Sequence, residues 1–179
     1  MKKAFLYTLL GFFTMVTLNS CGSGEAVDTL KKGDPIPEIE LYDQHKHLFS
    51  VNDFIGVNSL VIYFYPKDDT PGCTKEACTF RDSYDVFQSA GAMVIGISAD
   101  SPESHLEFAE KYGLPFPLLS DSENKISKAF GVPTEFMGTV PGRVTFIVDR
   151  EGIIQYVFQD LDSAEQHVEE AMQVIKQIG

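Results

Sequence analysis

Residues 63–78 read YFYPKDDTPGCTKEAC and join a predicted buried strand to a predicted helix that begins at a cysteine. The apolar, β-branched and aromatic run from Leu60 to Tyr65 indicates the strand, and the Pro, Asp and Gly residues after it indicate a turn. Cys73 then opens an amphipathic helix whose apolar face comprises Ala77, Phe80, Tyr84 and Phe87. A thiol in this position faces unpaired backbone N–H groups and the positive end of the helix dipole, which favour the reactive thiolate.

A second cysteine, Cys78, follows five residues after Cys73. On an ideal helix this spacing means about 7.5 Å of rise and about 140° of rotation, which puts the two Cα atoms about 8.6 Å apart. A disulfide requires Cα atoms within about 7 Å of each other. The pair can therefore bond only if the first helical turns unwind, as suits a nucleophile and a resolving thiol that meet after a conformational change. The spacing alone is equally compatible with two ordinary thiols.

The rest of the chain alternates between strand-like and helix-like patterns. Strands are predicted over 92–98, 116–119, 143–148 and 153–159, and a hairpin over 39–54. The helix that starts at Cys73 is expected to end at Gly91, and further helices are predicted over 102–112, 122–130 and 163–178. This order predicts an α/β fold with a mixed central sheet flanked by helices.

The stretch around Cys73 resembles the peroxiredoxins, specifically the bacterioferritin-comigratory-protein or peroxiredoxin Q group. Pro66, Thr70 and Cys73 fit the signature Pro-x-x-x-Thr/Ser-x-x-Cys, and Cys78 matches the resolving cysteine of the group. Arg143 matches an arginine that precedes a Thr-Phe strand. The resemblance extends over about residues 32–179 and implies a thioredoxin-like fold.

The resemblance implies a role for each matched residue. Cys73 would attack the peroxide, Thr70 would offer it a hydroxyl, and Pro66 would limit backbone freedom and help to exclude water. Arg143 would stabilise the thiolate and the developing negative charge. Glu76 matches a position that orients this arginine. From the residues alone, Arg143 is equally compatible with a surface or ion-paired arginine, and Glu76 with a solvated carboxylate near a helix N-terminus.

The implied function is that of a thiol-dependent peroxidase that reduces hydrogen peroxide and organic hydroperoxides. A sulfenic acid on Cys73 would be resolved by Cys78, and a thioredoxin-like dithiol reductant would then reduce the disulfide. The alternative is a membrane-tethered redox sensor or partner-binding protein that uses the same disulfide as a switch. Peroxide turnover with a reductant separates the two, because a sensor would be oxidised only once. The resemblance also favours a monomer.

Charge and histidine placement exclude other classes of function. The net charge is −12, which opposes nucleic-acid binding because phosphate contacts need a basic surface. His45 and His47 lie in a polar turn, whereas His105 and His167 are isolated on predicted helices. The four histidines form no metal set, and each is expected to be a surface residue. We therefore expect neither a metal nor a cofactor.

The first twenty residues have the pattern of an export signal. Two lysines at positions 2 and 3 precede an apolar run over 4–18, which is too short to span a membrane comfortably. Cys21 follows a small serine, with Leu18 three places before it, and this pattern resembles the lipobox of bacterial lipoproteins. Asn19 departs mildly from that pattern, and the alternative is a cleaved signal beside a cysteine that is not lipidated.

This pattern divides the chain into three parts. We expect a lipoprotein-type signal peptide over 1–20, a tether over 21–31 and a thioredoxin-like domain over 32–179. The mature protein would be exported and anchored to a bacterial membrane by a lipid on Cys21.

Overall fold

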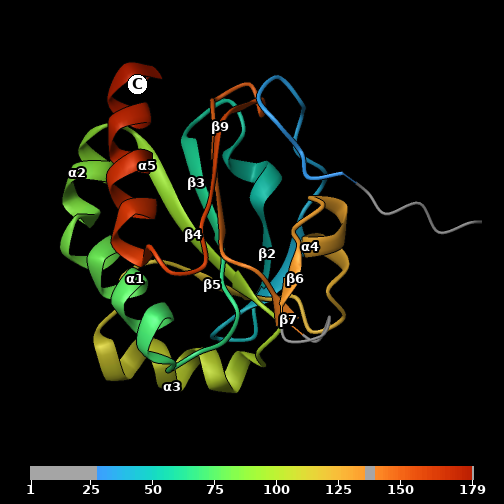
Figure 1. Ribbon diagram of the computed structural model, residues 1–179, viewed down its shortest axis with the longest axis vertical. Coiled ribbons are helices and arrows are strands. Elements are labelled where there is room, and N and C mark those ends of the chain that lie inside the picture. The colour runs from blue at the N-terminus through green and yellow to red at the C-terminus, as the bar shows by residue number, and fades with distance from the viewer. Residues whose placement is uncertain (1–27, 136–139, 179) are drawn as a thin grey trace, which may run out of the picture.

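The computed structural model describes residues 28–135 and 140–178 of the chain. The predicted signal peptide, Cys21 and most of the predicted tether lie outside the described residues. Within them, one sheet has the strand order β2-β1-β5-β4-β3-β8-β9 (Figure 1). Its strands are β1 (Glu40–Asp43), β2 (Leu48–Ser50), β3 (Ser59–Phe64), β4 (Ala92–Ser98), β5 (Leu118–Ser120), β8 (Val144–Val148) and β9 (Ile154–Gln159).

The remaining elements are helices and one short antiparallel pair of strands. The pair consists of β6 (Thr134–Glu135) and β7 (Val140–Pro141). The helices are η1 (Val51–Phe54), α1 (Pro71–Asp82), α2 (Tyr84–Ser89), α3 (Pro102–Tyr112), α4 (Lys125–Ala129) and α5 (Ala164–Ile178). Across the two described ranges, no helix combines the length and the apolar character that crossing a membrane requires.

The sheet is mixed, as the sequence predicted. Strands β3, β4 and β5 run parallel to one another, whereas β8 pairs antiparallel with β3, and β9 antiparallel with β8. At the other edge, β1 pairs antiparallel with both β5 and β2. Every residue of β3 is buried, because helices cover both faces of the central strands, and this explains its continuous apolar run.

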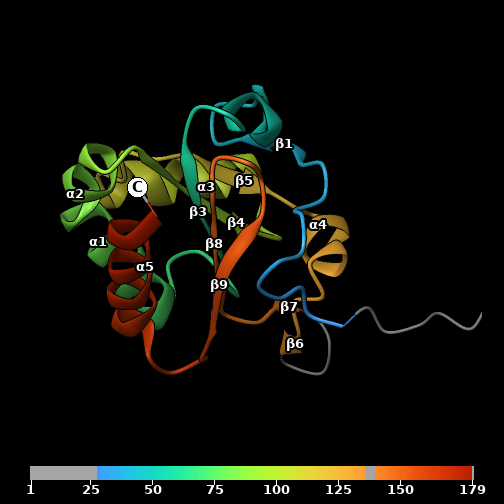
Figure 2. The ribbon, with the colours of Figure 1, turned by 90° about the horizontal axis from the view of Figure 1, so that it is seen from above.

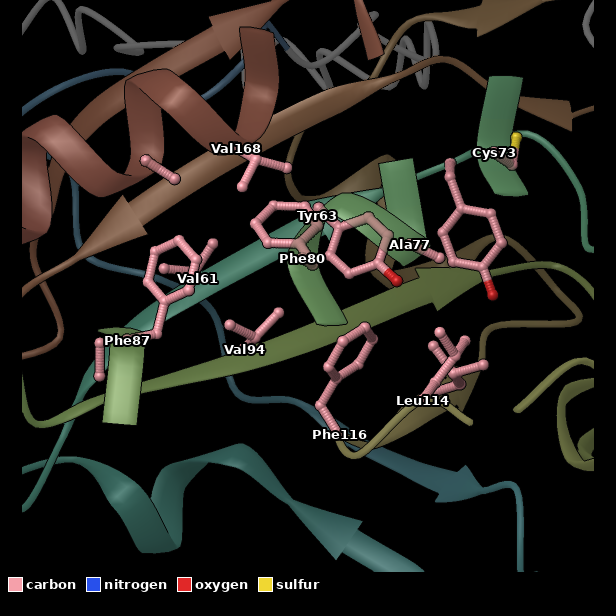
Figure 3. Packing of buried hydrophobic residues seen from close by; sticks show 14 of the residues in the cluster. Val61, Tyr63, Cys73, Ala77, Phe80, Phe87, Val94, Leu114, Phe116 and Val168 are labelled. Carbon is pink, nitrogen blue, oxygen red and sulfur yellow. The ribbon is translucent and has the colours of Figure 1, made fainter. Parts of the chain in front are cut away.

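Alternate residues of β3 divide the core into two layers. Val61 and Tyr63 point toward the layer that contains α1, α2, α3 and α5, where they pack with Phe80 and Phe116 (Figure 3). Leu60, Ile62 and Phe64 belong to the opposite layer, which contains η1 and α4. Figure 2 shows α1, α2 and α5 on one side of the sheet and α4 on the other. The two layers confirm the predicted architecture of helices on both faces.

The single helix expected from Cys73 to Gly91 is wrong in one respect, because the structure divides it at Ser83. Ser83 has φ −103° and ψ 3°, and its N–H bonds to the carbonyls of Thr79 and Phe80. This conformation ends α1 and starts α2 in a new direction. Phe87 of α2 is fully buried and packs on Phe80, with ring centroids 5.8 Å apart. The apolar face is therefore kept although the helix is broken.

Two further boundaries differ from the predicted ones. The helix expected over 122–130 begins only at Lys125, because Asn124 adopts a left-handed conformation with φ 53°. Asp121 satisfies the start of this helix, accepting hydrogen bonds from the backbone N–H groups of Ile126 and Ser127. The hairpin expected over 39–54 ends at Ser50, and the residues after it form η1.

Candidate active site

Cys73 lies in the first turn of α1, as predicted, and only 2% of its surface is exposed. Thr70 is the residue before the helix, and Pro71 occupies the first helical position, where its missing N–H costs nothing. The Thr70 hydroxyl donates to the carbonyl of Lys67 at 3.1 Å and does not cap the helix. It therefore lies beside the first turn without satisfying the backbone donors there.

Pairing within the sheet brings a distant arginine to this turn. Strand β8 lies antiparallel to β3, and Val144 is in register with Phe64. Arg143 consequently leaves the sheet where β3 continues into the turn before Cys73. The Nη2 atom of Arg143 donates to Cys73 Sγ at 3.5 Å. A Cβ atom at Gly72 would lie 2.9 Å from this Nη2, so the glycine leaves room for the guanidinium.

A pocket of about 480 Å³ opens above the cysteine. It is lined by Pro66, Lys67, Thr70, Cys73, Val140, Arg143, Leu161 and Asp162. The structure thus brings together four of the residues that the sequence singled out for peroxide chemistry, namely Pro66, Thr70, Cys73 and Arg143. Val140 and Leu161 add apolar surface to the pocket, and no sequence pattern indicated either of them.

The guanidinium of Arg143 is held at every nitrogen. Its Nε donates to the carbonyl of Leu161 at 3.0 Å, and its Nη1 donates to Glu76 Oε2. Both Arg143 and Glu76 are buried, so neither is a surface residue, and Arg143 is ion-paired, as one of the alternatives for it stated. The arrangement leaves Nη2 directed at the sulfur, where a cation stabilises a thiolate.

Burial acts on the pKa of both members of this ion pair. It raises the pKa of Glu76 to about 8, although Arg143 opposes that rise. Burial also tends to lower the pKa of Arg143, but Glu76 and Cys73 outweigh it and the pKa rises above its usual value. The arginine therefore remains a cation across the physiological pH range.

Cys78 lies one turn further along α1 and is half-buried. Both Cys73 and Cys78 are free thiols in this structure, and both belong to the continuous helix α1. The helical spacing that argues against a disulfide in the folded helix therefore applies here.

The expectation that all histidines lie at the surface is wrong for His105 and His167, which are fully buried. His105 donates from Nδ1 to Asp68 Oδ2 at 2.9 Å, within a cluster of polar groups beneath the turn. His167 lies 2.7 Å from Thr145 Oγ1 and 2.8 Å from the carbonyl of Asp160. A usable signal was present, because His167 falls on the apolar stripe of α5, which comprises Ala164, Val168, Ala171 and Ile175.

Among residues 28–135 and 140–178, no three His, Cys, Asp or Glu side chains are grouped so that they could hold a metal ion.

Comparisons with known proteins agree on one family. Residues 32–157 match the AhpC/TSA family. A chloroplastic peroxiredoxin Q of Populus jackii is 47% identical over 149 residues, which make up 83% of this chain and 70% of that protein. The peroxiredoxin Q of Arabidopsis thaliana is 46% identical over 147 residues, or 82% of this chain and 68% of that protein.

Solved structures give the same result. Peroxidoxin BcpB of Mycobacterium tuberculosis superposes with a TM-score of 0.78 and 33% identity, over 84% of this chain and 99% of that one. The bacterioferritin comigratory protein of Xanthomonas campestris, studied for its alkyl peroxide reduction activity, superposes with a TM-score of 0.69 and 30% identity. That match covers 79% of this chain and 98% of the other.

Proposed function

Because this chain belongs to the AhpC/TSA family, in its peroxiredoxin Q group, and is a thiol-dependent peroxidase with a thioredoxin-like fold, we propose that Cys73 is its peroxide-reducing thiol. The observation that carries this assignment is the donation from Arg143 Nη2 to Cys73 Sγ at 3.5 Å, inside a pocket. No other cysteine among the described residues lines that pocket.

In the proposed reaction, the Cys73 thiolate attacks one oxygen of the peroxide. A new S–O bond forms as the O–O bond breaks, and the sulfur is oxidised to a sulfenic acid. The departing oxygen takes a proton and leaves as water or as an alcohol. Arg143 stabilises the negative charge that passes from sulfur to the leaving oxygen, and Thr70 offers its hydroxyl to the bound peroxide. Pro66 shields one side of the pocket from water.

We propose that Cys78 resolves the sulfenic acid within the same chain. Its thiolate attacks the Cys73 sulfur, an S–S bond forms, and the oxygen leaves as water after taking protons. The first turns of α1 unwind for this step, because the folded helix keeps the two thiols on different turns. A thioredoxin-like dithiol then reduces the disulfide by thiol–disulfide exchange.

The pocket supports organic hydroperoxides as substrates alongside hydrogen peroxide. Val140 and Leu161 form an apolar part of its wall, and 39% of the Leu161 surface is exposed. An alkyl chain on the peroxide would cover these side chains and be removed from water. Thr70 and Arg143, the polar residues that would contact the O–O bond, line the same pocket.

Disulfide mapping tests the proposed resolution step. The reduced chain is treated with one equivalent of peroxide, digested without reduction and analysed by mass spectrometry. We expect an intramolecular Cys73–Cys78 link, and repeated turnover when a thioredoxin-type dithiol is supplied. The matched variant Cys78→Ser should still consume the first equivalent of peroxide, and a second equivalent should over-oxidise its Cys73 sulfenic acid. A stable sulfenic acid or an intermolecular dimer as the main product would contradict the assignment of Cys78. Oxidation without turnover would favour the redox-switch alternative.

For the rest of the chain, we propose an exported, lipid-anchored monomer. The support is the sequence pattern of residues 1–20, the lipobox-like position of Cys21 and the tether over 21–31. The domain over 32–179 would then act at the surface of a bacterial membrane. Sedimentation of the lipid-free domain tests whether it is a monomer.

A further inference from the structure

His167 lies beside the groups that hold the guanidinium of Arg143 in place. It lies on α5, is fully buried, and takes no part in the reaction proposed above. Its Nε2 is 2.8 Å from the carbonyl of Asp160, and its Nδ1 is 2.7 Å from Thr145 Oγ1. The same Nδ1 lies 3.7 Å from Glu76 Oε1, which has no hydrogen-bond partner among the described residues.

These contacts define the tautomer of the imidazole. A backbone carbonyl can only accept, so Nε2 carries the proton that is donated to Asp160. In the neutral ring Nδ1 is then an acceptor, and the hydroxyl of Thr145 donates to it. Both ring nitrogens are thus engaged by neighbours that fix the plane of the ring.

The surroundings keep the ring neutral. Burial, reinforced by the charge of Arg143, lowers the pKa of His167 to about 4, although the carbonyl and charge of Asp160 oppose the shift. The titratable groups that face the ring are Glu76 from α1, Arg143 before β8 and Asp160 after β9. Phe158 of β9 packs edge-on against it, with ring centroids 4.7 Å apart.

Each group that holds Arg143 in place lies next to a neighbour of His167, or is itself one. The Nε of Arg143 is bound by the carbonyl of Leu161, the residue directly after Asp160. Its Nη1 is bound by Glu76, whose other oxygen faces His167. The backbone that carries Arg143 continues into β8, where Thr145 is the second residue. His167 therefore bonds to Asp160 and Thr145, two groups that adjoin Arg143, and lies beside Glu76 without touching the sulfur itself.

We propose that His167 is a positioning residue for the peroxidase reaction, which fixes Arg143 beside Cys73 through Asp160 and Thr145. The proposal rests on the role of Arg143 given above. Removing the imidazole would leave the carbonyl of Asp160 without its donor and Thr145 without its acceptor, so the guanidinium would be held less firmly beside the sulfur. A displacement of about 1 Å at a reacting centre slows catalysis by up to about a hundredfold.

The test compares His167→Leu, His167→Gln and a matched control in the full chain. We expect His167→Leu to slow oxidation of Cys73 by one equivalent of peroxide by about tenfold to a hundredfold. It should also slow alkylation of Cys73 by iodoacetamide at neutral pH, because the thiolate loses its cation. His167→Gln keeps a donor for the Asp160 carbonyl and should recover part of both rates. Ile175→Val, a buried change two turns along α5, should oxidise at the parental rate.

The outcomes separate this proposal from the proposed function. If Cys73→Ser consumes peroxide like the parent, the assignment of Cys73 itself fails. If the parent oxidises at Cys73 but folded His167→Leu does so at the same rate, only the positioning role is overturned. Equal slowing in Ile175→Val would show a general effect of helix packing and would also overturn it. Should His167→Leu not fold, Thr145→Val removes the donor to Nδ1 and must slow both reactions for the proposal to stand.

Discussion

A single donor from Arg143 reaches the sulfur of Cys73, so this residue should govern the first oxidation step. We expect Arg143→Ala to slow oxidation of Cys73 about a hundredfold, because a preorganised charge at the reacting centre is lost. Arg143→Lys should recover only part, since an ammonium lacks the planar fork that binds Leu161 and Glu76 together. Stopped-flow mixing of the reduced chain with peroxide measures the rate.

Arg150→Ala is the matched control, because that arginine is exposed and lies beyond the opposite end of β8 from Arg143. It should react like the parent. If Arg143→Ala were oxidised at the parental rate, Arg143 would have a structural role alone.

Glu76 should make stability depend on pH. Its pKa is about 8 in the folded chain against about 4.5 when unfolded, so the folded state binds the proton more tightly. The stabilisation that this tighter proton binding gives the folded state is complete below pH 4.5 and is lost as the pH rises toward 8. As the pH rises, the free energy of unfolding of the parent, relative to that of Glu76→Gln, should therefore fall by up to about 1.4 kcal/mol per pH unit.

Urea denaturation of both proteins at pH 6.5 and pH 8 measures this difference. Glu165→Gln alters an exposed glutamate and should leave the pH dependence unchanged. Parallel stability curves for the parent and Glu76→Gln would mean that burial does not raise the pKa of Glu76.

Individual site residues differed in how well the sequence revealed them. Pro66, Thr70 and Cys73 lie close together in the chain, and a local signature predicted their meeting, as the resemblance did for Arg143. The surface position expected for His167 is wrong because the residue lies on an apolar stripe of α5, where even a polar side chain is buried. Val140 and Leu161 reach the pocket only through the path of their loops, which no periodic pattern in the sequence encodes.

At the level of elements, α3 holds both ends of the segment that unwinds in the proposed resolution step. Before α1, Asp68 accepts hydrogen bonds from Ser104 and His105 of α3, at 2.8 and 2.9 Å. At the end of α1, Arg81 donates to the carbonyl of Tyr112, the last residue of α3, at 2.6 Å. Unwinding is therefore expected between these two attachments.

Hydrogen exchange of the oxidised chain tests this expectation. Once the disulfide between Cys73 and Cys78 has formed, the amides over 71–78 should exchange quickly, because their helical hydrogen bonds are lost. The amides of α5 should remain protected. Cys78→Ser under the same peroxide treatment is the control and should keep α1 protected. Slow exchange throughout α1 in the disulfide form would contradict the unwinding step.

The elements themselves were largely predictable, apart from their ends. The run from Leu60 to Tyr65 identified β3 because a strand covered on both faces is apolar throughout. The break at Ser83 was not predictable, since the apolar spacing continues across it and only the packing of Phe87 against Phe80 requires a new direction. Tertiary contacts, which periodicity does not record, determine such breaks.

For the whole molecule, the alternation of strands and helices was enough to predict a mixed sheet with two covered faces. The antiparallel pairing of β8 with β3 was not contained in that alternation. It nevertheless determines function, because it places Arg143 beside the helix that carries Cys73. The fold thus supplies the long-range contact that completes a locally encoded site.

The proposed lipid anchor predicts where the whole protein is found. A multiply acylated N-terminus binds membranes firmly, whereas one chain binds only marginally, so the protein should remain with membranes through a high-salt wash. Cys21→Ser should lose the lipid and impair processing, whereas Cys78→Ser should remain membrane-bound. Fractionation and N-terminal mass spectrometry measure both. Recovery of the parent as a soluble cytosolic species that still starts at Met1 would overturn the anchor.

The central claim, that Cys73 is the thiol that reduces peroxide, is tested most directly by peroxide consumption in a single turnover. The reduced parent, Cys78→Ser and Cys73→Ser are each mixed with one equivalent of peroxide, and the peroxide that remains is measured over time. We expect rapid loss of peroxide with the parent and with Cys78→Ser, and none above the uncatalysed rate with Cys73→Ser. Consumption by Cys73→Ser at the parental rate would contradict the claim.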